Sequence, residues 1–244
     1  MRITRVFVPE PLIVDAALTI DNESAHHLIN VLRVKQDQPL VLFNGDGNEY
    51  SAQINEVHKR KVIVNVDAKL AIGAESKFPI HLGQGIAKGD RMETVLQKAT
   101  ELGVTEITPI ITQRCNVKLS PERWAKKLVQ WEKVIIGACE QSGRNVLPIL
   151  HPPITLSEWC KQSTEQYRIT FDPHAQQHLQ ALPVTQHGIR ILIGPEGGFS
   201  EAETYGAEQT GFNTVKIGPR VLRTETAAIA SIAIIQATYG DLTL

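Results

Sequence analysis

Residues 1–70 show the alternation of apolar and polar positions that is typical of β-strands. An apolar run at 39–43 is followed by the Asn-Gly-Asp-Gly-Asn segment at 44–48, which favours a hairpin turn. Apolar positions then nearly alternate over 50–57, and 61–66 reads as a further strand. Residues 27–32 instead have the spacing of a short helix. Several strands and one helix in so short a segment predict a small β-barrel.

The pattern changes after residues 71–79, which have the composition of a linker. From residue 80 onward, apolar runs alternate with segments of helical period, and this order predicts a parallel sheet with helices on both faces. The expected strands are 80–86, 107–111, 167–171, 189–193 and 214–217, and the expected helices are 90–103, 120–143, 200–211 and 224–239. We therefore divide the chain into residues 1–72 and residues 73–244.

Capping residues mark the starts of several expected helices. Asp90 and Ser120 are expected N-caps, and Ser200 with Glu203 has the spacing of a capping box. The last helix is apolar on every side over 227–235. Such a helix is buried on more than one side, and a deep core and a subunit interface are both open as explanations.

Composition is that of an ordinary globular protein. Of the 244 residues, 42% are hydrophobic and 21% are charged, and no apolar run approaches the ~20 residues that cross a bilayer. The N-terminus has no apolar core of signal-peptide length, so we expect a cytoplasmic protein. Three widely spaced cysteines argue against disulfides and zinc, and His174 and His178 lack a third ligand, so we expect no metal.

The net charge of the chain is −1, but its charged residues are unevenly distributed along the sequence. Residues 80–150 contain ten Lys and Arg against seven Asp and Glu, whereas acidic residues predominate in 1–72 and in 151–244. Any basic surface is therefore local, and charge alone leaves RNA binding as one hypothesis among several.

Two glycine-rich loops are the main candidates for ligand binding. The first, Ile193–Ser200, reads Ile-Gly-Pro-Glu-Gly-Gly-Phe-Ser, and the second, Ile217–Thr226, reads Ile-Gly-Pro-Arg-Val-Leu-Arg-Thr-Glu-Thr. Each follows an expected strand, and ligands of open α/β sheets bind at the carboxyl ends of strands. Glycine lets the backbone approach a flat ligand, so the loops can form opposite walls of one pocket. A tight turn without a ligand explains the first loop equally well.

Plainer alternatives exist for the second loop as well. Arg223 and Glu225 could form a helix-terminal ion pair, and Thr224 could be a helix cap. A third segment places Arg91 and Lys98 on one helix face, where they could contact phosphates or only solvent. Phosphate loops, the dinucleotide fingerprint and the nucleophile elbow are absent from the sequence.

Taken together, these segments resemble the RsmE family. The resemblance rests on Gly194–Gly198, Gly218–Ala227 and the helix at 97–103, and it extends to Arg2-Ile3-x-Arg5 and Glu140–Asn145. Members of this family belong to the SPOUT superfamily. They use S-adenosylmethionine to methylate N3 of a uridine, uridine 1498, in the 16S ribosomal RNA of the small ribosomal subunit. The likeness covers nearly the whole chain.

The resemblance implies a fold and an assembly that the pattern alone does not. Residues 73–244 are expected to form an α/β domain with a trefoil knot, although general topology rules argue against knots. Residues 1–72 are expected to form a PUA-like β-barrel that helps to hold RNA. A homodimer with cofactor pockets at its interface is also implied, and it would account for the apolar last helix.

The cofactor is expected to be held largely by the backbone of the two loops. The residues expected to bind S-adenosylmethionine are Phe171, Leu192, Ile193, Gly194, Pro195, Glu196, Gly197, Gly198, Ile217, Gly218, Pro219, Val221, Leu222, Thr224, Thr226 and Ala227.

The reaction needs an electrophile and a way to accommodate loss of the uridine N3 proton. S-adenosylmethionine supplies the electrophilic methyl group, and the N3 proton is weakly acidic, near the range of a Tyr or Lys side chain. We hypothesise that Arg223, or Arg220, stabilises negative charge on the uracil oxygens. Glu225 is the candidate base or orienting group, with Glu196 as second candidate. Alignment alone could also suffice, without an essential base.

The residues expected to contact RNA are Arg2, Arg5, Arg33, Lys88, Arg91, Lys98, Arg114 and Arg144, although solubility alone would also explain such cations. Three other functions stay open. The chain could be a non-catalytic RNA-binding factor, a methyltransferase of transfer RNA, or a nucleotide-binding enzyme of the doubly wound type. Failure to bind S-adenosylmethionine would favour the first of these, and the absence of phosphate loops argues against the last.

Overall fold

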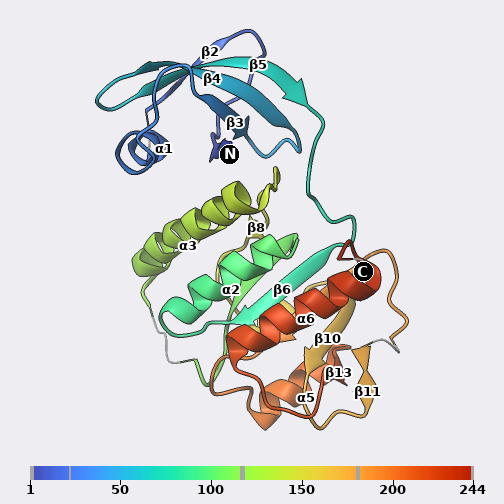
Figure 1. Ribbon diagram of the computed structural model, residues 1–244. Helices are drawn as coiled ribbons and strands as arrows, with labels where there is room; N and C mark the ends of the chain where they lie inside the picture. Colours follow the sequence, from blue (N-terminus) through green and yellow to red (C-terminus); the bar gives the residue numbers. More distant parts are fainter. Residues whose placement is uncertain (1–2, 22, 116–118, 180–181, 243–244) are drawn as a thin grey trace. The chain divides into compact units, whose positions relative to one another are not determined.

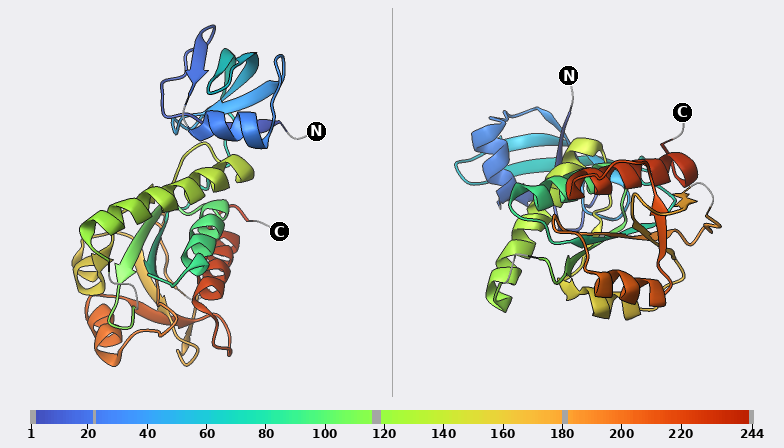
Figure 2. Two further views of the ribbon diagram at one scale, coloured as in Figure 1. Left: turned by 90° about the vertical axis from the view of Figure 1, so that its left-hand side faces the viewer. Right: turned by 90° about the horizontal axis from the view of Figure 1, so that it is seen from below.

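The computed structural model describes residues 3–21, 23–115, 119–179 and 182–242. The chain divides into two compact units, each with a sheet of its own (Figures 1 and 2). Unit 1 contains Met1–Glu75 and Ile136–Leu147, and unit 2 contains Ser76–Ile135 and Pro148–Leu244.

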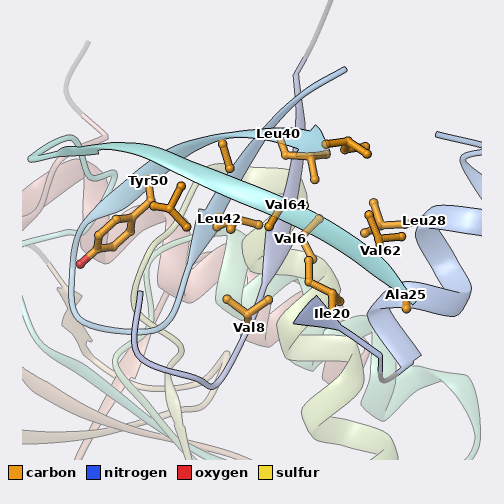
Figure 3. Packing of buried hydrophobic residues seen from close by; sticks show 13 residues of the cluster. Val6, Val8, Ile20, Ala25, Leu28, Leu40, Leu42, Tyr50, Val62 and Val64 are labelled. Atoms are coloured by element: carbon orange, nitrogen blue, oxygen red, sulfur yellow. The ribbon is translucent and has the colours of Figure 1, made fainter. Parts of the chain in front are cut away.

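Unit 1 is built on a five-stranded, mainly antiparallel sheet with the order β1-β3-β4-β5-β2. Its strands are β1 (Thr4–Phe7), β2 (Ala17–Ile20), β3 (Pro39–Phe43), β4 (Glu49–Val57) and β5 (Val62–Leu70). Helix α1 (Glu23–His26) continues into the π-helical turn η1 (His27–Val31). Alternate strand residues such as Leu42 and Val64 belong to the same apolar core as Ala25 and Leu28 of this helical segment (Figure 3).

The three long strands and the helix of unit 1 were predicted from the sequence, but β1 and β2 were missed. Each of these has four residues, of which only Val6 and Ile20 are buried, so their alternation is too short to recognise. The hydrogen-bonded order of strands is open, with β1 and β2 at the two edges. The structure therefore establishes a five-stranded sheet, and its closure into a barrel stays a prediction.

Residues 136–147 complete unit 1 through buried polar contacts. Asn145 is fully buried and accepts a hydrogen bond from Arg5 at 2.6 Å. The carboxylate of Glu75 accepts from Arg144 Nε at 2.9 Å and from the backbone N–H of Asn145 at 2.8 Å. Because buried polar groups are stable only when paired, these contacts fix the segment to the sheet of unit 1.

Unit 2 contains an eight-stranded sheet in which every pair of strands is parallel, as predicted. The order is β11-β13-β10-β12-β6-β7-β8, and β9 also pairs with β7. The strands are β6 (Ile80–Gly85), β7 (Glu106–Ile111), β8 (Ile149–Leu150), β9 (Ile154–Thr155), β10 (Tyr167–Phe171), β11 (Gln177–His178), β12 (Ile189–Ile193) and β13 (Asn213–Lys216). The central strands β6 and β12 are buried along their whole length.

Helices cover both faces of this sheet, as the alternating sequence predicted (Figure 2). On one face α2 (Asp90–Glu101) packs against α6 (Thr224–Tyr239), and on the other α4 (Leu156–Lys161) packs against α5 (Glu201–Gln209). The long helix α3 (Pro121–Ser142) begins in unit 2 and ends in unit 1.

Helix starts were predicted with mixed success. The capping box at α5 is confirmed, since Ser200 and Glu203 each accept a hydrogen bond from the backbone of the other. Asp90 was wrong as an N-cap, because it is already the first helical residue of α2 and Gly89 precedes it without a side-chain cap. Helix α4 was missed, although Thr155 and Glu158 give it a capping box that the sequence displays.

Helix α6 buries one of its apolar sides within the single chain. Ala228, Ile232 and Ile235 are buried, whereas Ile229 and Ile234 are half-buried. The remaining apolar surface is what a subunit interface would cover, so the homodimer stays a prediction.

Two expectations from composition can be compared with the structure. The three cysteines, Cys115, Cys139 and Cys160, are buried and form no disulfide with one another, which fits their expected role as small core residues. Within the described ranges, the helices are too short or too polar to span a bilayer.

One group of potential metal ligands occurs among the described residues, and it consists of His81, Glu106 and His151. His151 Nε2 lies 2.8 Å from Glu106 Oε2, and His81 Nε2 lies 2.7 Å from Thr108 Oγ1. The two imidazole rings are stacked, with centroids 5.3 Å apart and an interplanar angle of 29°. The potential ligand atoms of the three residues lie within 4.8 Å of one another, but His81 and Glu106 already contact Thr108 and His151. The absence of a metal therefore stays our prediction.

We expect the stability of unit 2 to depend on pH through His81. Burial lowers the pKa of His81 from 6.5 to about 4. The negative charge of Glu106 raises this pKa, but its effect is smaller than that of burial. Between these pH values the unfolded chain binds a proton that the folded unit does not, so the free energy of unfolding falls as the pH falls. His81→Gln should flatten this dependence. Urea unfolding followed by tryptophan fluorescence measures it, because all three tryptophans lie in unit 2.

The matched control is His187→Gln, whose side chain is 53% exposed. It should keep the pH dependence of the wild-type chain. A slope for His81→Gln that equals the wild-type slope would show that His81 is protonated in the folded state as well.

Candidate functional site

The two glycine-rich loops lie at the same edge of the sheet in unit 2. The first follows β12 and the second follows β13, and β10 lies between these two strands. A cavity of about 660 Å³ opens between the loops, within the size range of small-molecule sites. The prediction that the two loops form walls of one pocket is confirmed.

The first loop is held by side chains from outside it. Glu196 Oε1 accepts hydrogen bonds from the backbone N–H of Lys88 and from Arg91 Nη1, both at 2.9 Å. Arg114 Nη1 donates to the carbonyl of Gly197 at 2.8 Å. The loop is therefore fixed before a ligand binds, which reduces the entropy that binding costs.

These contacts determine the charge state of Glu196. Burial raises the pKa of Glu196, but hydrogen bonds from the backbone N–H groups of Lys88 and of Glu196 itself, together with the Arg91 guanidinium, bring that pKa below its ordinary value. A carboxylate that is charged and already accepts two hydrogen bonds is a poor proton acceptor. The structure thus argues against Glu196 as a base and assigns it to holding the loop.

Glycines allow the close packing at the base of this loop. Gly198 has a φ of 65° and donates to the carbonyl of Pro195 at 2.9 Å, which closes a tight turn. At the end of β6, a Cβ on Gly85 would lie 2.5 Å from the nitrogen of Pro195. Only glycine fits there, so the end of β6 sets the position of the loop backbone.

The second loop brings one carboxylate and two cations to the cavity. Glu225 is half-buried and lines the cavity, and its Oε2 is buried with no hydrogen-bond partner among the described residues. Arg220 and Arg223 are exposed and line the same cavity. An ion pair between Arg223 and Glu225 is not found in the described part of the chain.

Thr224 connects the two loops. Arg223 occupies the N-cap position of α6, so the alternative role of Thr224 as a cap is wrong. Thr224 Oγ1 instead donates to the carbonyl of Gly194 at 2.5 Å and accepts from Gln84 Nε2 at 2.9 Å. One wall of the cavity is thus bonded directly to the other.

Most residues expected to bind the cofactor line this cavity. The exceptions are Pro219, which lines a neighbouring cavity of about 360 Å³, and Thr226, which is exposed on α6. Sequence reasoning missed Thr170, Asp172, Pro173, Phe199, Thr204, Ala207 and Thr214. The first three surround Phe171 at the end of β10, and the order of strands in the sheet, which places β10 between the loops, cannot be read from the sequence.

Two of the cations expected to contact RNA are structural instead. The side chains of Arg5 and Arg144 are 10% and 4% exposed, and they form ion pairs with Glu49 and Glu75 inside unit 1. The expectation that Arg5 and Arg144 contact RNA is therefore wrong, because both side chains are largely buried and already form ion pairs with carboxylates.

The other expected RNA contacts are distributed over both units. Arg33 and Lys88 are exposed, and Lys98 Nζ lies 2.8 Å from Glu101 Oε1 on the same helix. Arg91 and Arg114 are also exposed but hold the first loop, as described above. Arg2 lies outside the described residues.

Comparison with known families defines the class of this protein. A model described as an RNA methyltransferase domain matches residues 74–236, and one described as an RNA methyltransferase PUA domain matches residues 20–67. The first match covers more than half of the chain and contains every residue of the cavity wall. The class is therefore that of the RNA methyltransferases.

Full-length relatives narrow the class. A protein of Buchnera aphidicola subsp. Schizaphis graminum named Ribosomal RNA small subunit methyltransferase E is 36% identical over 99% of this chain and 98% of its own length. The protein of the same name from Bacillus subtilis is 30% identical over 89% of this chain and 88% of its own length. The chain belongs to the family of ribosomal RNA small subunit methyltransferase E.

Two solved structures share the fold over the whole chain. A methyltransferase of Legionella pneumophila in complex with S-adenosylmethionine superposes with a TM-score of 0.96 at 43% identity, covering 99% of this chain and 100% of the other. A ribosomal RNA small subunit methyltransferase E of Neisseria gonorrhoeae, also bound to S-adenosylmethionine, has a TM-score of 0.93 at 36% identity, with the same coverage.

The residues present in this chain fit that cofactor. Three glycines of the first loop, Gly194, Gly197 and Gly198, line the cavity without side chains, so backbone faces a flat ligand there. Glu225, which is half-buried, adds a carboxylate to the cavity wall, and a carboxylate accepts a hydrogen bond from a donor of the ligand.

Proposed function

We propose that this protein transfers a methyl group from S-adenosylmethionine to N3 of a uridine, uridine 1498, in the 16S ribosomal RNA of the small ribosomal subunit. The observation that carries the proposal is the cavity between the two loops, which is lined by the carboxylate residue Glu225 together with the exposed Arg220 and Arg223. The relatives' names and their complexes with S-adenosylmethionine support both the cofactor and the class of substrate.

The chemistry of uracil explains the need for these side chains. S-adenosylmethionine supplies an electrophilic methyl group when bound. As N3 loses its proton, negative charge develops on the neighbouring uracil oxygens, and a guanidinium group stabilises such charge by donating hydrogen bonds. We assign this role to Arg223, with Arg220 as second candidate. We assign Glu225 to accepting or orienting the N3 proton.

We assign cofactor binding to the loop residues that line the cavity. The set is Phe171, Leu192, Ile193, Gly194, Pro195, Glu196, Gly197, Gly198, Ile217, Gly218, Val221, Leu222, Thr224 and Ala227. Within it, Glu196 acts through the loop it holds.

The architecture and the RNA surface form part of the same proposal. We propose residues 1–72 as a PUA-like barrel, residues 73–244 as a trefoil-knotted domain, and a cytoplasmic homodimer that covers the apolar surface of α6. For RNA phosphates we propose Arg33, Lys88, Arg91, Lys98 and Arg114, of which Arg91 and Arg114 also hold the first loop.

The decisive experiment combines labelled S-adenosylmethionine with small ribosomal subunits from cells that lack this protein. We expect the label to enter 16S ribosomal RNA and to map to a 3-methyluridine at the proposed position. Naked 16S ribosomal RNA and transfer RNA serve as parallel substrates. Label in transfer RNA, or at another atom or nucleotide, contradicts the proposed target, and binding of the cofactor without transfer to any RNA contradicts an enzymatic role.

A further inference from the structure

Gln84 is a buried amide that lies next to the cavity wall without being part of it. It is the penultimate residue of β6, it is 0% exposed, and it is not among the residues that line the cavity. Its Nε2 donates to Thr224 Oγ1 and to the carbonyl of Gly85, both at 2.9 Å. The side chain therefore joins the centre of the sheet to the first residue of α6.

The hydroxyl of Thr224 extends this connection to the first loop. Thr224 Oγ1 donates to the carbonyl of Gly194 at 2.5 Å. A hydroxyl has a single hydrogen, so once this is used for Gly194, only a lone pair is left to face Gln84. The amide hydrogens of Gln84 match that lone pair. Gln84 thus fixes the direction of the Thr224 hydroxyl, and Thr224 fixes the separation of the two walls.

Packing alone does not account for an amide at this position. If the amide were turned over, Gln84 Oε1 would face the carbonyl of Gly85, and two acceptors would meet. In the observed orientation Oε1 is buried with no partner among the described residues, which costs free energy. A methionine would fill a similar volume without that cost. The two donated hydrogen bonds are therefore what distinguishes glutamine from an apolar side chain here.

We propose that Gln84 is a positioning residue for the cofactor pocket, acting through Thr224 to hold the start of α6 against the first loop. The inference rests on the proposed function in one respect, since it takes S-adenosylmethionine as the ligand of the cavity. Arg223 and Glu225 flank Thr224 in the chain, so the same connection also orients the side chains assigned to the uracil base.

Isothermal titration calorimetry of the full chain with S-adenosylmethionine tests the proposal. Gln84→Met removes both donors and keeps the volume. We expect the dissociation constant of S-adenosylmethionine to rise about tenfold, as for the loss of one or two hydrogen bonds that hold a binding wall in place. Circular dichroism and the melting temperature report whether the variant is folded.

A double-mutant cycle shows whether Gln84 acts through Thr224. Thr224→Val removes the hydroxyl and should weaken binding at least as much as Gln84→Met does, and Thr224→Ser should recover most of that loss. Adding Gln84→Met to Thr224→Val should change the affinity by less than about twofold, because the connection is already broken. Independent, additive losses contradict the proposed path.

Gln236→Met is the matched structural control. Gln236 is also 0% exposed, and it joins α6 to the end of α2 by donating to the carbonyl of Leu102 at 2.9 Å, away from the cavity. It removes a buried hydrogen bond outside the cavity, so it should lower the melting temperature but leave the affinity for S-adenosylmethionine within about twofold of the wild type.

The results separate this inference from the proposed function. If the wild-type chain binds S-adenosylmethionine and Gln84→Met binds it as tightly as Gln236→Met, the positioning role is wrong and the proposed function stands. If the wild-type chain binds no S-adenosylmethionine, the proposed function fails and the inference fails with it.

Discussion

Replacement of Arg223 by alanine is expected to slow methyl transfer by a factor of about 100 or more, as for the loss of one donor that stabilises developing charge. The same change should alter the dissociation constant of S-adenosylmethionine by less than about threefold, because an interaction made mainly in the transition state contributes little to ground-state binding. Arg223 is exposed and lines the cavity, so its truncation leaves no buried gap. Single-turnover methylation of small subunits and calorimetry measure the two quantities.

Arg220→Ala separates the two candidates, since Arg220 lines the same cavity. If Arg220→Ala slows methyl transfer and Arg223→Ala does not, then Arg220 rather than Arg223 stabilises the negative charge on the uracil oxygens. Losses of rate and cofactor affinity that are equal for Arg223→Ala would instead make Arg223 part of the cofactor site.

Gly85→Ala is expected to abolish measurable binding of S-adenosylmethionine. The added Cβ would lie 2.5 Å from the nitrogen of Pro195 and 2.9 Å from the carbonyl carbon of Gly194. These are backbone atoms that cannot rotate away, so the first loop must move as a whole. The contacts of Glu196 with Lys88 and Arg91, and of Gly194 with Thr224, are then lost. Calorimetry should show at least about a hundredfold weaker binding, and methyl transfer should fall with it.

Gly206→Ala is the control for the glycine substitution. Gly206 lies within α5, and a Cβ there would meet nothing within 4 Å. This variant should bind S-adenosylmethionine as the wild type does and gain up to about 1 kcal/mol in stability, because alanine favours the helix. Unimpaired binding by Gly85→Ala would mean that the loop adjusts freely and that its position is not set by the end of β6.

Much of the fold could be predicted because the decisive signals are local. The strands at 167–171 and 189–193 and the helix at 224–239 have the predicted bounds, since each combines a clear apolar period with a glycine, a proline or a cap at its ends. The two loops could be recognised as ligand candidates for the same reason. Parallel strands present their carboxyl ends at one edge, so loops that follow such strands share that edge.

The features that escaped prediction depend on contacts between distant residues. Nothing near Arg144 or Arg5 in the sequence shows that Glu75 and Glu49 neutralise them, so their charges looked available to RNA. Gln84 lies in an apolar strand, and its bond to Thr224 spans 140 residues of sequence. The contribution of β10 to the cavity likewise depends on strand order, which no single segment encodes.

Unit 1 is formed by two separate stretches of the chain, and this has a consequence for its folding during synthesis. Its sheet is complete by Leu70, but Asn145, which binds Arg5, and Glu140, which accepts from the backbone of Phe7, follow only after the first part of unit 2. While the ribosome is still translating the intervening residues, the nascent sheet exposes Arg5 and the backbone of β1 without these partners. A fragment that stops at residue 75 repeats this unfinished state, so an isolated unit 1 has to include residues 136–147, for example by circular permutation.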